Sequence, residues 1–283
     1  MNWVVLAFSS VLFFTLLNLL QRVLAVDSKY PRAISLLFNV SAAVISLSIY
    51  FVTGEHTKFA LPSEPIAYIS LLVAVVCYGL FERLRFVAAK LLDASVLTTI
   101  GNLSVFVAFI GALILYKETV TPGKILGGFL IIIALLIVST ENLKGKNSLK
   151  GVAVGIFTSI LIGIAWMLDK LGAGYFNANT YSILVWTLPI VFIIFPYIKF
   201  SEIKSELKQA SWKVVVLAGI NVFGYLLQLK ALEIAEATRV IPIVQTSILL
   251  TIILGVIFLN ERNYVAKKII AGIMAIAGAY FLI

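Results

Sequence analysis

The chain has 283 residues, of which 61% are hydrophobic and only 12% are charged, and its mean hydropathy is +1.09. These values exclude a water-soluble domain, which needs a larger polar surface. The formal net charge of +9 does not indicate a nucleic-acid partner, because the Lys and Arg residues are scattered over the short connections instead of forming one patch. We therefore expect a protein embedded in lipid.

The spacing of charged residues predicts ten membrane-spanning helices. Each uncharged interval is roughly one bilayer crossing of about 20 residues, if charged flanks supply the last turn. In chain order the intervals are 1–21, 33–54, 65–81, 94–116, 125–140, 151–168, 171–198, 214–229, 240–260 and 269–283. They are too long for the strands of a membrane barrel and lack strict alternation. We expect an all-α, multi-pass integral protein of the cell membrane.

The first interval, Met1 to Leu20, has the hydropathy of a signal peptide. It lacks a basic leader and a clear small-residue cleavage site, so we interpret it as the first membrane helix. Cys77 lies inside an apolar interval and His56 lies in a polar loop, and neither indicates a redox or metal site. We expect no cofactor and no metal.

A motif occurs twice at the same spacing. Asp93-Ala94-Ser95, an apolar run and Glu118 recur as Glu236-Ala237-Thr238, another apolar run and Glu261. Each glutamate closes a long helix, and Thr121-Pro122 has the residue types of an N-cap and first position of the next helix. We therefore predict that each glutamate caps the helix that follows it, in preference to contacting a solute.

This repetition divides the chain into two halves of five helices. We predict a first repeat over 1–140, a polar linker over 141–148 and a second repeat over 149–283. Because five is odd, the second repeat must cross the membrane in the opposite direction, which makes an inverted repeat. The glycine-containing last helices of the two halves are expected to pack closely against a neighbour. The connection from Lys199 to Lys213 alternates Lys with Glu and predicts an interfacial helix.

Polar side chains inside apolar intervals indicate which helix faces point inward. Tyr78, Glu82 and Arg85 share one face of the third helix. The matching positions of the eighth helix are Asn221, Tyr225 and Gln228. We expect these six residues to surround a cavity for a small zwitterionic or hydroxylated solute, with Glu82 as the candidate for proton coupling. The alternative is an interfacial Glu82–Arg85 pair that only anchors the third helix.

Other apolar intervals contain further candidates for solute contact. These are Asn18, Asn39, Asn102, Trp166, Trp186 and Gln245. Hydrogen bonds between helices explain any one of the Asn and Gln residues without a role in binding. Pro242 predicts a kink in the ninth helix, which serves either as a hinge or as a structural bend.

The second half carries the residues of a known family. Ala231 to Pro242, Phe258-Leu259-Asn260-Glu261 and Ala271-Gly272 resemble the small-residue turn, mid-helix proline, terminal glutamate and glycine-bearing last helix of the EamA-like branch of the drug/metabolite transporter superfamily. The resemblance covers essentially the whole chain. The first half matches less fully, because Thr99 stands where the second half has Pro242, and the intervals of helices 2 and 7 show no early arginine.

This resemblance implies a carrier of amino acids, other small metabolites, sugars or sugar phosphates, with cytoplasmic termini. The charge distribution predicts the reverse orientation, because most Lys and Arg residues lie in the connections after helices 1, 3, 5, 7 and 9. The orientation stays open.

We expect a secondary transporter, an exporter by resemblance, for a small polar or amphipathic metabolite such as an amino acid. It would work by alternating access, as a monomer or homodimer, with a small-molecule solute and membrane lipid as partners and no nucleic acid. One alternative is a flippase or membrane subunit for a lipid-linked sugar, and a less favoured one is an intramembrane enzyme. The sequence shows no paired catalytic carboxylates, nucleophile elbow, phosphate-binding loop or His-rich motif, so we expect no enzyme.

Overall fold

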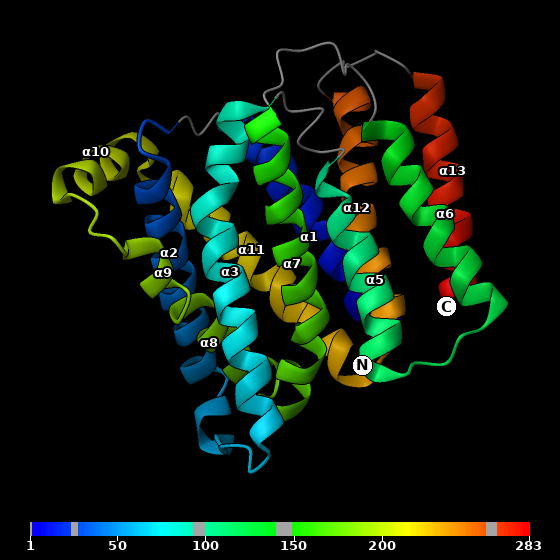
Figure 1. Ribbon diagram of the computed structural model, residues 1–283, viewed down its shortest axis with the longest axis horizontal. Helices are drawn as coiled ribbons and strands as arrows, with labels where there is room; N and C mark the ends of the chain where they lie inside the picture. The colour runs from blue at the N-terminus through cyan, green and yellow to red at the C-terminus, as the bar shows by residue number, and fades with distance from the viewer. Residues whose placement is uncertain (1, 24–27, 93–99, 140–148, 259–264) are drawn as a thin grey trace.

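A computed structural model describes residues 2–23, 28–92, 100–139, 149–258 and 265–283, and the regular elements of these ranges are helices (Figure 1). The first half contains α1 (Trp3–Val23), α2 (Pro31–Val52), η1 (Glu55–Lys58), α3 (Pro65–Leu91), α5 (Leu103–Tyr116) and α6 (Pro122–Ser139). The second half contains α7 (Leu149–Phe176), α8 (Ala178–Thr187), α9 (Ile190–Ile194), α10 (Phe200–Ala210), α11 (Trp212–Ile234), α12 (Ala237–Phe258) and α13 (Val265–Leu282). The linker predicted over 141–148 lies outside the described residues.

These helices correspond to the ten predicted crossings. Five of them, α1, α2, α3, α7 and α11, are long and apolar enough to span a membrane. Shorter apolar stretches lie in α5, α6, α12 and α13, and α8 with α9 forms one more over Ala178–Ile194. The all-α membrane fold predicted from the charge spacing is confirmed.

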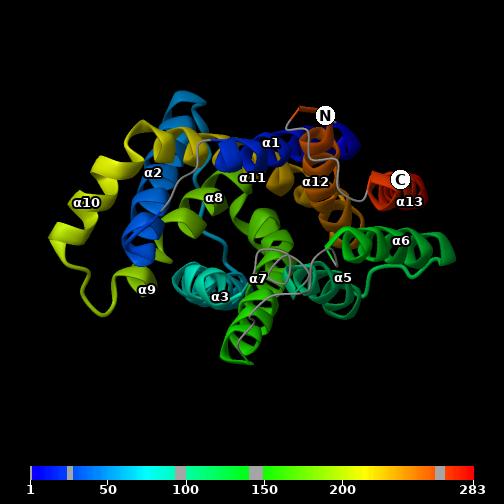
Figure 2. The ribbon, with the colours of Figure 1, turned by 90° about the horizontal axis from the view of Figure 1, so that it is seen from above.

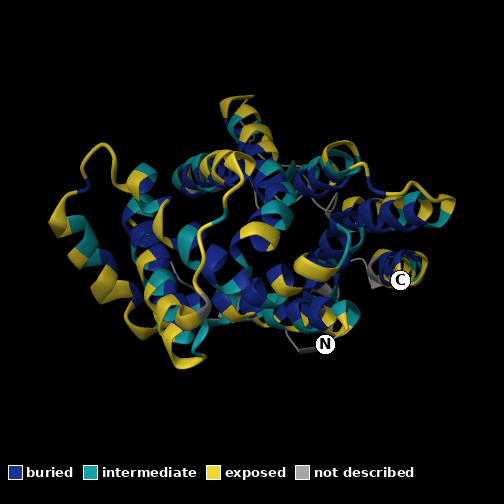
Figure 3. Cartoon of the chain, turned by 90° about the horizontal axis from the view of Figure 1, so that it is seen from below, coloured by how far each residue is buried: buried dark blue, intermediate teal, exposed yellow. Residues whose placement is uncertain are grey.

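The outer surface of the bundle is apolar, as a lipid-facing surface must be. Leu12 and Leu72 are each 63% exposed, and Ile276 is 74% exposed. Figure 3 shows the buried residues concentrated on the inner faces of the helices and the exposed residues on their outer faces. Large apolar side chains thus face outward, where a soluble domain would mostly carry polar ones.

One predicted helix boundary is wrong, and one expected absence is corrected, because charged residues lie inside helices. Helix α7 continues to Phe176, so Asp169 and Lys170 belong to it instead of ending it. Helix α2 begins at Pro31, which places Arg32 in its first turn, where sequence analysis found no arginine. Such residues are tolerated where partners satisfy them: Arg32 Nη2 donates to the carbonyls of Ile193 at 2.8 Å and Pro196 at 2.6 Å.

Helix α10 confirms the helix predicted between Lys199 and Lys213. Its Glu206 is buried, and Glu206 Oε1 accepts hydrogen bonds from the backbone N–H groups of Lys29 at 2.9 Å and Tyr30 at 2.6 Å. These amides immediately precede α2, so a carboxylate of the second repeat caps a helix of the first.

The most extensive helix contacts join the two repeats. Helix α3 packs on α7, and its repeat counterpart α11 packs on α1; likewise α5 packs on α7, and its counterpart α12 packs on α1. The last helices of the repeats, α6 and α13, pack against each other at one end of the molecule (Figure 2). Helix α1 begins, and α7 ends, on the side that carries both chain ends (Figure 1). This is the pairing that an inverted repeat requires.

Helices α6 and α13 meet at two glycines. A Cβ atom on Gly127 would lie 2.7 Å from the Gly278 carbonyl oxygen, and one on Gly278 would lie 2.8 Å from the Gly127 carbonyl oxygen. Small residues let helix backbones approach closely where no hydrophobic effect drives association. The close packing predicted for these two helices is confirmed.

Gly127→Ala is expected to lower the free energy of unfolding by about 1–3 kcal/mol, because its methyl group would overlap backbone that has no flexible side chain to yield. Thermal unfolding in detergent measures this. Gly123→Ala is the matched control on the same helix, since its Cβ would lie at an ordinary 3.6 Å from the Phe281 carbonyl oxygen. Equal melting temperatures for the two variants would contradict the glycine contact.

Candidate solute-binding cavity

A cavity of about 250 Å³ lies between helices of both repeats. Its lining includes Tyr78, Glu82 and Arg85 from α3 and Asn221, Tyr225 and Gln228 from α11. Helices α1, α2, α7, α8 and α12 complete it with Asn18, Asn39, Trp166, Trp186, Gln245 and several apolar residues. The structure therefore brings the two predicted helix faces together around one space, and solute binding there stays a prediction.

Asn102 is the candidate that does not line this cavity. It lies just before α5, and its Nδ2 donates to the Leu135 carbonyl at 3.1 Å. It lines a neighbouring pocket of about 280 Å³, which shares Arg85, Trp166 and Gln245 with the main cavity. Its amide thus has a structural partner, as interhelical hydrogen bonding predicts.

Glu82 and Arg85 form an ion pair on the cavity lining. Arg85 Nη2 lies 3.0 Å from Glu82 Oε2, which also accepts from Ser35 Oγ at 2.9 Å. The rings of Phe38 and Phe81 lie 5.7 and 5.8 Å from the guanidinium carbon. This surrounding fixes the charged pair within a cavity between helices, which favours a role in binding over the interfacial anchor.

Among the uncharged side chains of the lining, two N–H donors have no acceptor in the described part of the chain. They are Gln228 Nε2 and Trp186 Nε1, in side chains of residues that are 2% and 9% exposed. A buried donor without an acceptor is costly in an apolar surrounding. Together with Arg85, these donors make the cavity lining suitable for a chemical group that has several hydrogen-bond acceptors.

Sequence reasoning missed a fully buried carboxylate, Asp169. Its Oδ2 accepts from the Tyr78 hydroxyl at 2.8 Å, and its Oδ1 accepts from the hydroxyls of Tyr225 at 2.9 Å and Tyr181 at 3.2 Å. Two of these tyrosines also line the cavity. The available signal was the helical spacing of Ala165, Asp169, Gly172 and Phe176, which are all buried on α7.

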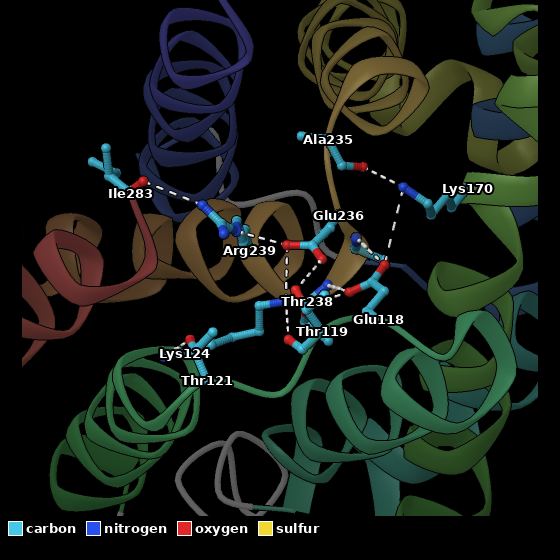
Figure 4. Close-up of polar contacts among 11 residues, drawn as sticks. Glu118, Thr119, Thr121, Lys124, Lys170, Ala235, Glu236, Thr238, Arg239 and Ile283 are labelled. Atoms are coloured by element: carbon cyan, nitrogen blue, oxygen red, sulfur yellow. Dashed lines mark hydrogen bonds and ion pairs between the residues drawn. The ribbon is translucent and has the colours of Figure 1, made fainter.

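Glu118 corrects a prediction about the repeated motif. It does not cap α6, the helix that follows it, but α12 of the other repeat (Figure 4). Glu118 Oε1 accepts from the Ala237 N–H at 2.8 Å, and Oε2 accepts from the N–H of Thr238 at 3.1 Å and from its hydroxyl. The start of α6 is already capped by Thr121 Oγ1, which accepts from the Lys124 N–H at 3.2 Å.

Thr121 and Pro122 thus confirm the predicted start of α6, and the carboxylate serves a helix that the fold brings alongside. The glutamate of the first motif copy binds the second copy at Ala237-Thr238. The reciprocal partners, 93–95 and Glu261, lie outside the described residues.

Charged residues of both repeats surround this cap (Figure 4). Lys124, which is 2% exposed, places Nζ 2.8 Å from Glu236 Oε2, and Arg239 Nε lies 2.7 Å from the same oxygen. Burial raises the pKa of Glu236, but the hydrogen bonds from Lys124 and Arg239 outweigh it and hold that pKa below its ordinary value. The contribution of Glu236 to stability is therefore present at neutral pH and is lost as the pH falls through this lowered pKa.

Pro242 lies within α12, which is continuous from Ala237 to Phe258. The missing N–H leaves the carbonyl of Thr238, one turn earlier, without its helical donor. Gln245 on the cavity lining follows Pro242 within one turn. The hinge role of Pro242 stays a prediction.

Comparisons with known proteins agree with this architecture. The sequence model of the EamA-like transporter family matches residues 1–140 and 149–283. A solved crystal structure is similar with a TM-score of 0.74 and 12% sequence identity, covering 98% of this chain and 94% of that chain, which shows the fold alone. No curated protein matches the chain.

The family resemblance read from the residues is confirmed by the match across both repeats. Members of this family are multi-pass membrane transporters, and their usual location is the cell membrane. The chain is therefore a membrane transporter. An enzymatic role does not fit the family. The chain belongs to the EamA-like transporter family.

Proposed function

We propose that the chain is a secondary transporter that exports a small zwitterionic metabolite, such as an amino acid, by alternating access between its two repeats. One observation carries this proposal. A cavity lined by both repeats holds a carboxylate, a guanidinium and two buried N–H donors without acceptors in the described residues, at Glu82, Arg85, Gln228 and Trp186.

The chemistry of the lining matches the two ends of an amino acid. Arg85, Gln228 and Trp186 supply donors for a carboxylate, and Glu82 supplies an acceptor for an ammonium group. The volume of about 250 Å³ is slightly below the range of ordinary small-molecule pockets, which begins at about 300 Å³. This size favours a small metabolite over a lipid-linked sugar.

The inverted repeats supply the means of alternating access. The most extensive helix contacts cross between repeats, so the cavity can change its accessible side by rocking one repeat against the other. On the side of the chain ends, Glu118 and the Lys124–Glu236 pair tie the repeats together. Export follows the family resemblance, and the sequence suggested Glu82 as one candidate for proton coupling.

Counterflow in liposomes tests the proposal. Purified protein is reconstituted into vesicles loaded with unlabelled alanine, leucine or phenylalanine, and uptake of the same labelled amino acid is measured. We expect uptake above that of protein-free vesicles for at least one of them. Phenethylamine lacks the carboxylate of phenylalanine, and 3-phenylpropionate lacks its ammonium group. Neither compound should exchange with phenylalanine. If no solute exchanges while a labelled lipid-linked sugar moves between leaflets, the flippase alternative is correct.

A further inference from the structure

We propose that Asp169 is the residue through which this transporter couples solute movement to protons, an inference that rests on the proposed transport function. The carboxylate would take up a proton from one aqueous side and release it to the other, in exchange for one solute. No bond of the solute forms or breaks. Glu82 would then serve binding only.

The position of Asp169 supports this assignment. Tyr78 lies near the middle of α3 and Tyr225 near the middle of α11, and both donate to Asp169. Although Asp169 belongs to α7, these two partners on α3 and α11 place its carboxylate at the depth of the bilayer interior. Carboxylates at this depth are costly to maintain, and in transporters they mark ion and proton pathways.

Asp169 has no cationic partner in the described part of the chain. Its own neighbour Lys170 instead donates to the Ala235 carbonyl and lies 4.0 Å from Glu118 Oε1. The titratable groups around Asp169 from the packed helices are Tyr78 and Cys77 on α3, Tyr116 on α5, Tyr181 on α8 and Tyr225 on α11. Among the described residues, tyrosine hydroxyls compensate its charge, whereas Glu82 is paired with Arg85 at 3.0 Å.

The hydrogen bonds of Asp169 connect it to the cavity. The hydroxyls of Tyr78 and Tyr225 donate to its two oxygens, lie 3.4 Å from each other and belong to residues of the cavity lining. A proton on Asp169 turns one acceptor oxygen into a donor, so the tyrosine hydroxyl that meets this proton must rotate its own hydrogen away and accept instead. The polar face offered to a solute therefore depends on whether Asp169 is charged.

Transport driven by a pH gradient tests the inference with the amino acid that gives the largest counterflow. In Asp169→Asn, the ratio of gradient-driven accumulation to counterflow should be at least about fivefold lower than in wild type, because the pH gradient no longer drives the solute. A pH-sensitive dye inside the vesicles should show loss of solute-dependent proton flux. In Glu82→Gln, a loss of binding should lower counterflow and driven accumulation in proportion.

The assignment would be overturned by any of these transport results: normal gradient-driven accumulation by Asp169→Asn, a loss of the gradient response confined to Glu82→Gln, or accumulation in wild type driven by sodium and not by protons. Absence of counterflow in wild type would instead refute the proposed function. Infrared difference spectra on acidification test Asp169 without any solute, because Asp169→Asn should lack one component of the carbonyl band that protonated carboxyls produce. An unchanged band would also overturn the assignment.

Tyr181→Phe gives a second variant that does not depend on the folding of Asp169→Asn. Tyr181 donates to Asp169 at 3.2 Å and is absent from the cavity lining. Because a donor stabilises the charged carboxylate, its removal should shift the pH profile of driven transport to higher pH. Tyr175→Phe on the exposed face of α7 is the matched control and should leave the profile unchanged. Coincident profiles for the two variants would contradict the role of the cluster.

Discussion

Arg85→Ala is expected to weaken solute binding by about 10- to 100-fold, the equivalent of about 1.5–3 kcal/mol for hydrogen bonds to a charged group. Arg85 is the only Lys or Arg on the described cavity lining, so no other cation there can meet a carboxylate. The substitution also leaves Glu82 without its counter-charge in the cavity. Dissociation constants from isothermal titration with the best-transported amino acid measure the effect.

Two further arginine variants control this prediction. Arg85→Lys keeps the charge but loses the two-pronged geometry, so an intermediate affinity is expected. Arg83→Ala removes an arginine of the same helix that contacts the Phe195 carbonyl instead of the cavity, and affinity should not change. Wild-type affinity in a correctly folded Arg85→Ala protein would show that the guanidinium does not contact the solute.

Glu118→Gln is expected to lower the free energy of unfolding by about 2–4 kcal/mol. The change keeps the size of the side chain but removes the charge that faces the N-terminus of α12, and one of its two acceptor oxygens becomes a donor. That donor would confront the N–H of either Ala237 or Thr238. Thermal and denaturant unfolding in detergent measure the loss.

Glu64→Gln is the control for this cap. Glu64 also precedes a helix, α3, but is exposed and makes no capping hydrogen bond with its side chain, so its substitution should have little effect. If Glu118→Gln keeps its stability and loses solute binding, then the solute-contact role that the sequence left open is the correct one for this residue.

Local signals account for what could be predicted from the sequence. Apolar length gave the crossings, alternating Lys and Glu gave α10, and Thr121-Pro122 gave the start of α6. The lining residues of α3 and α11 were predictable because the helical period relates the residues within α3 and the repeat offset relates α3 to α11. Both can be read from the sequence. In each case the information lies within one helix or in the comparison of two.

Partners distant in the sequence account for what could not be predicted. The predicted interval 151–168 excludes Asp169 because a charge normally marks a helix boundary, and only the fold reveals Tyr78, 91 residues away, as a donor. Glu118 was assigned to the next helix because sequence analysis cannot see that Ala237, 119 residues away, lies beside it. Whether a charged residue can be buried inside a helix depends on its tertiary contacts. A helix boundary predicted at each charged residue is therefore wrong wherever such contacts exist.

The exchange of caps between repeats has a consequence for how the protein is made. Glu206 of the second half caps α2, and Glu118 of the first half caps α12. Until the ribosome has completed the second half, the amides before α2 therefore lack the Glu206 carboxylate that they bind in the finished protein. Likewise, α1 lacks its packing partner α11, and α3 lacks its packing partner α7. Because both repeats belong to one polypeptide, these partners become available as soon as translation is complete. Two separate molecules do not have to meet in the bilayer.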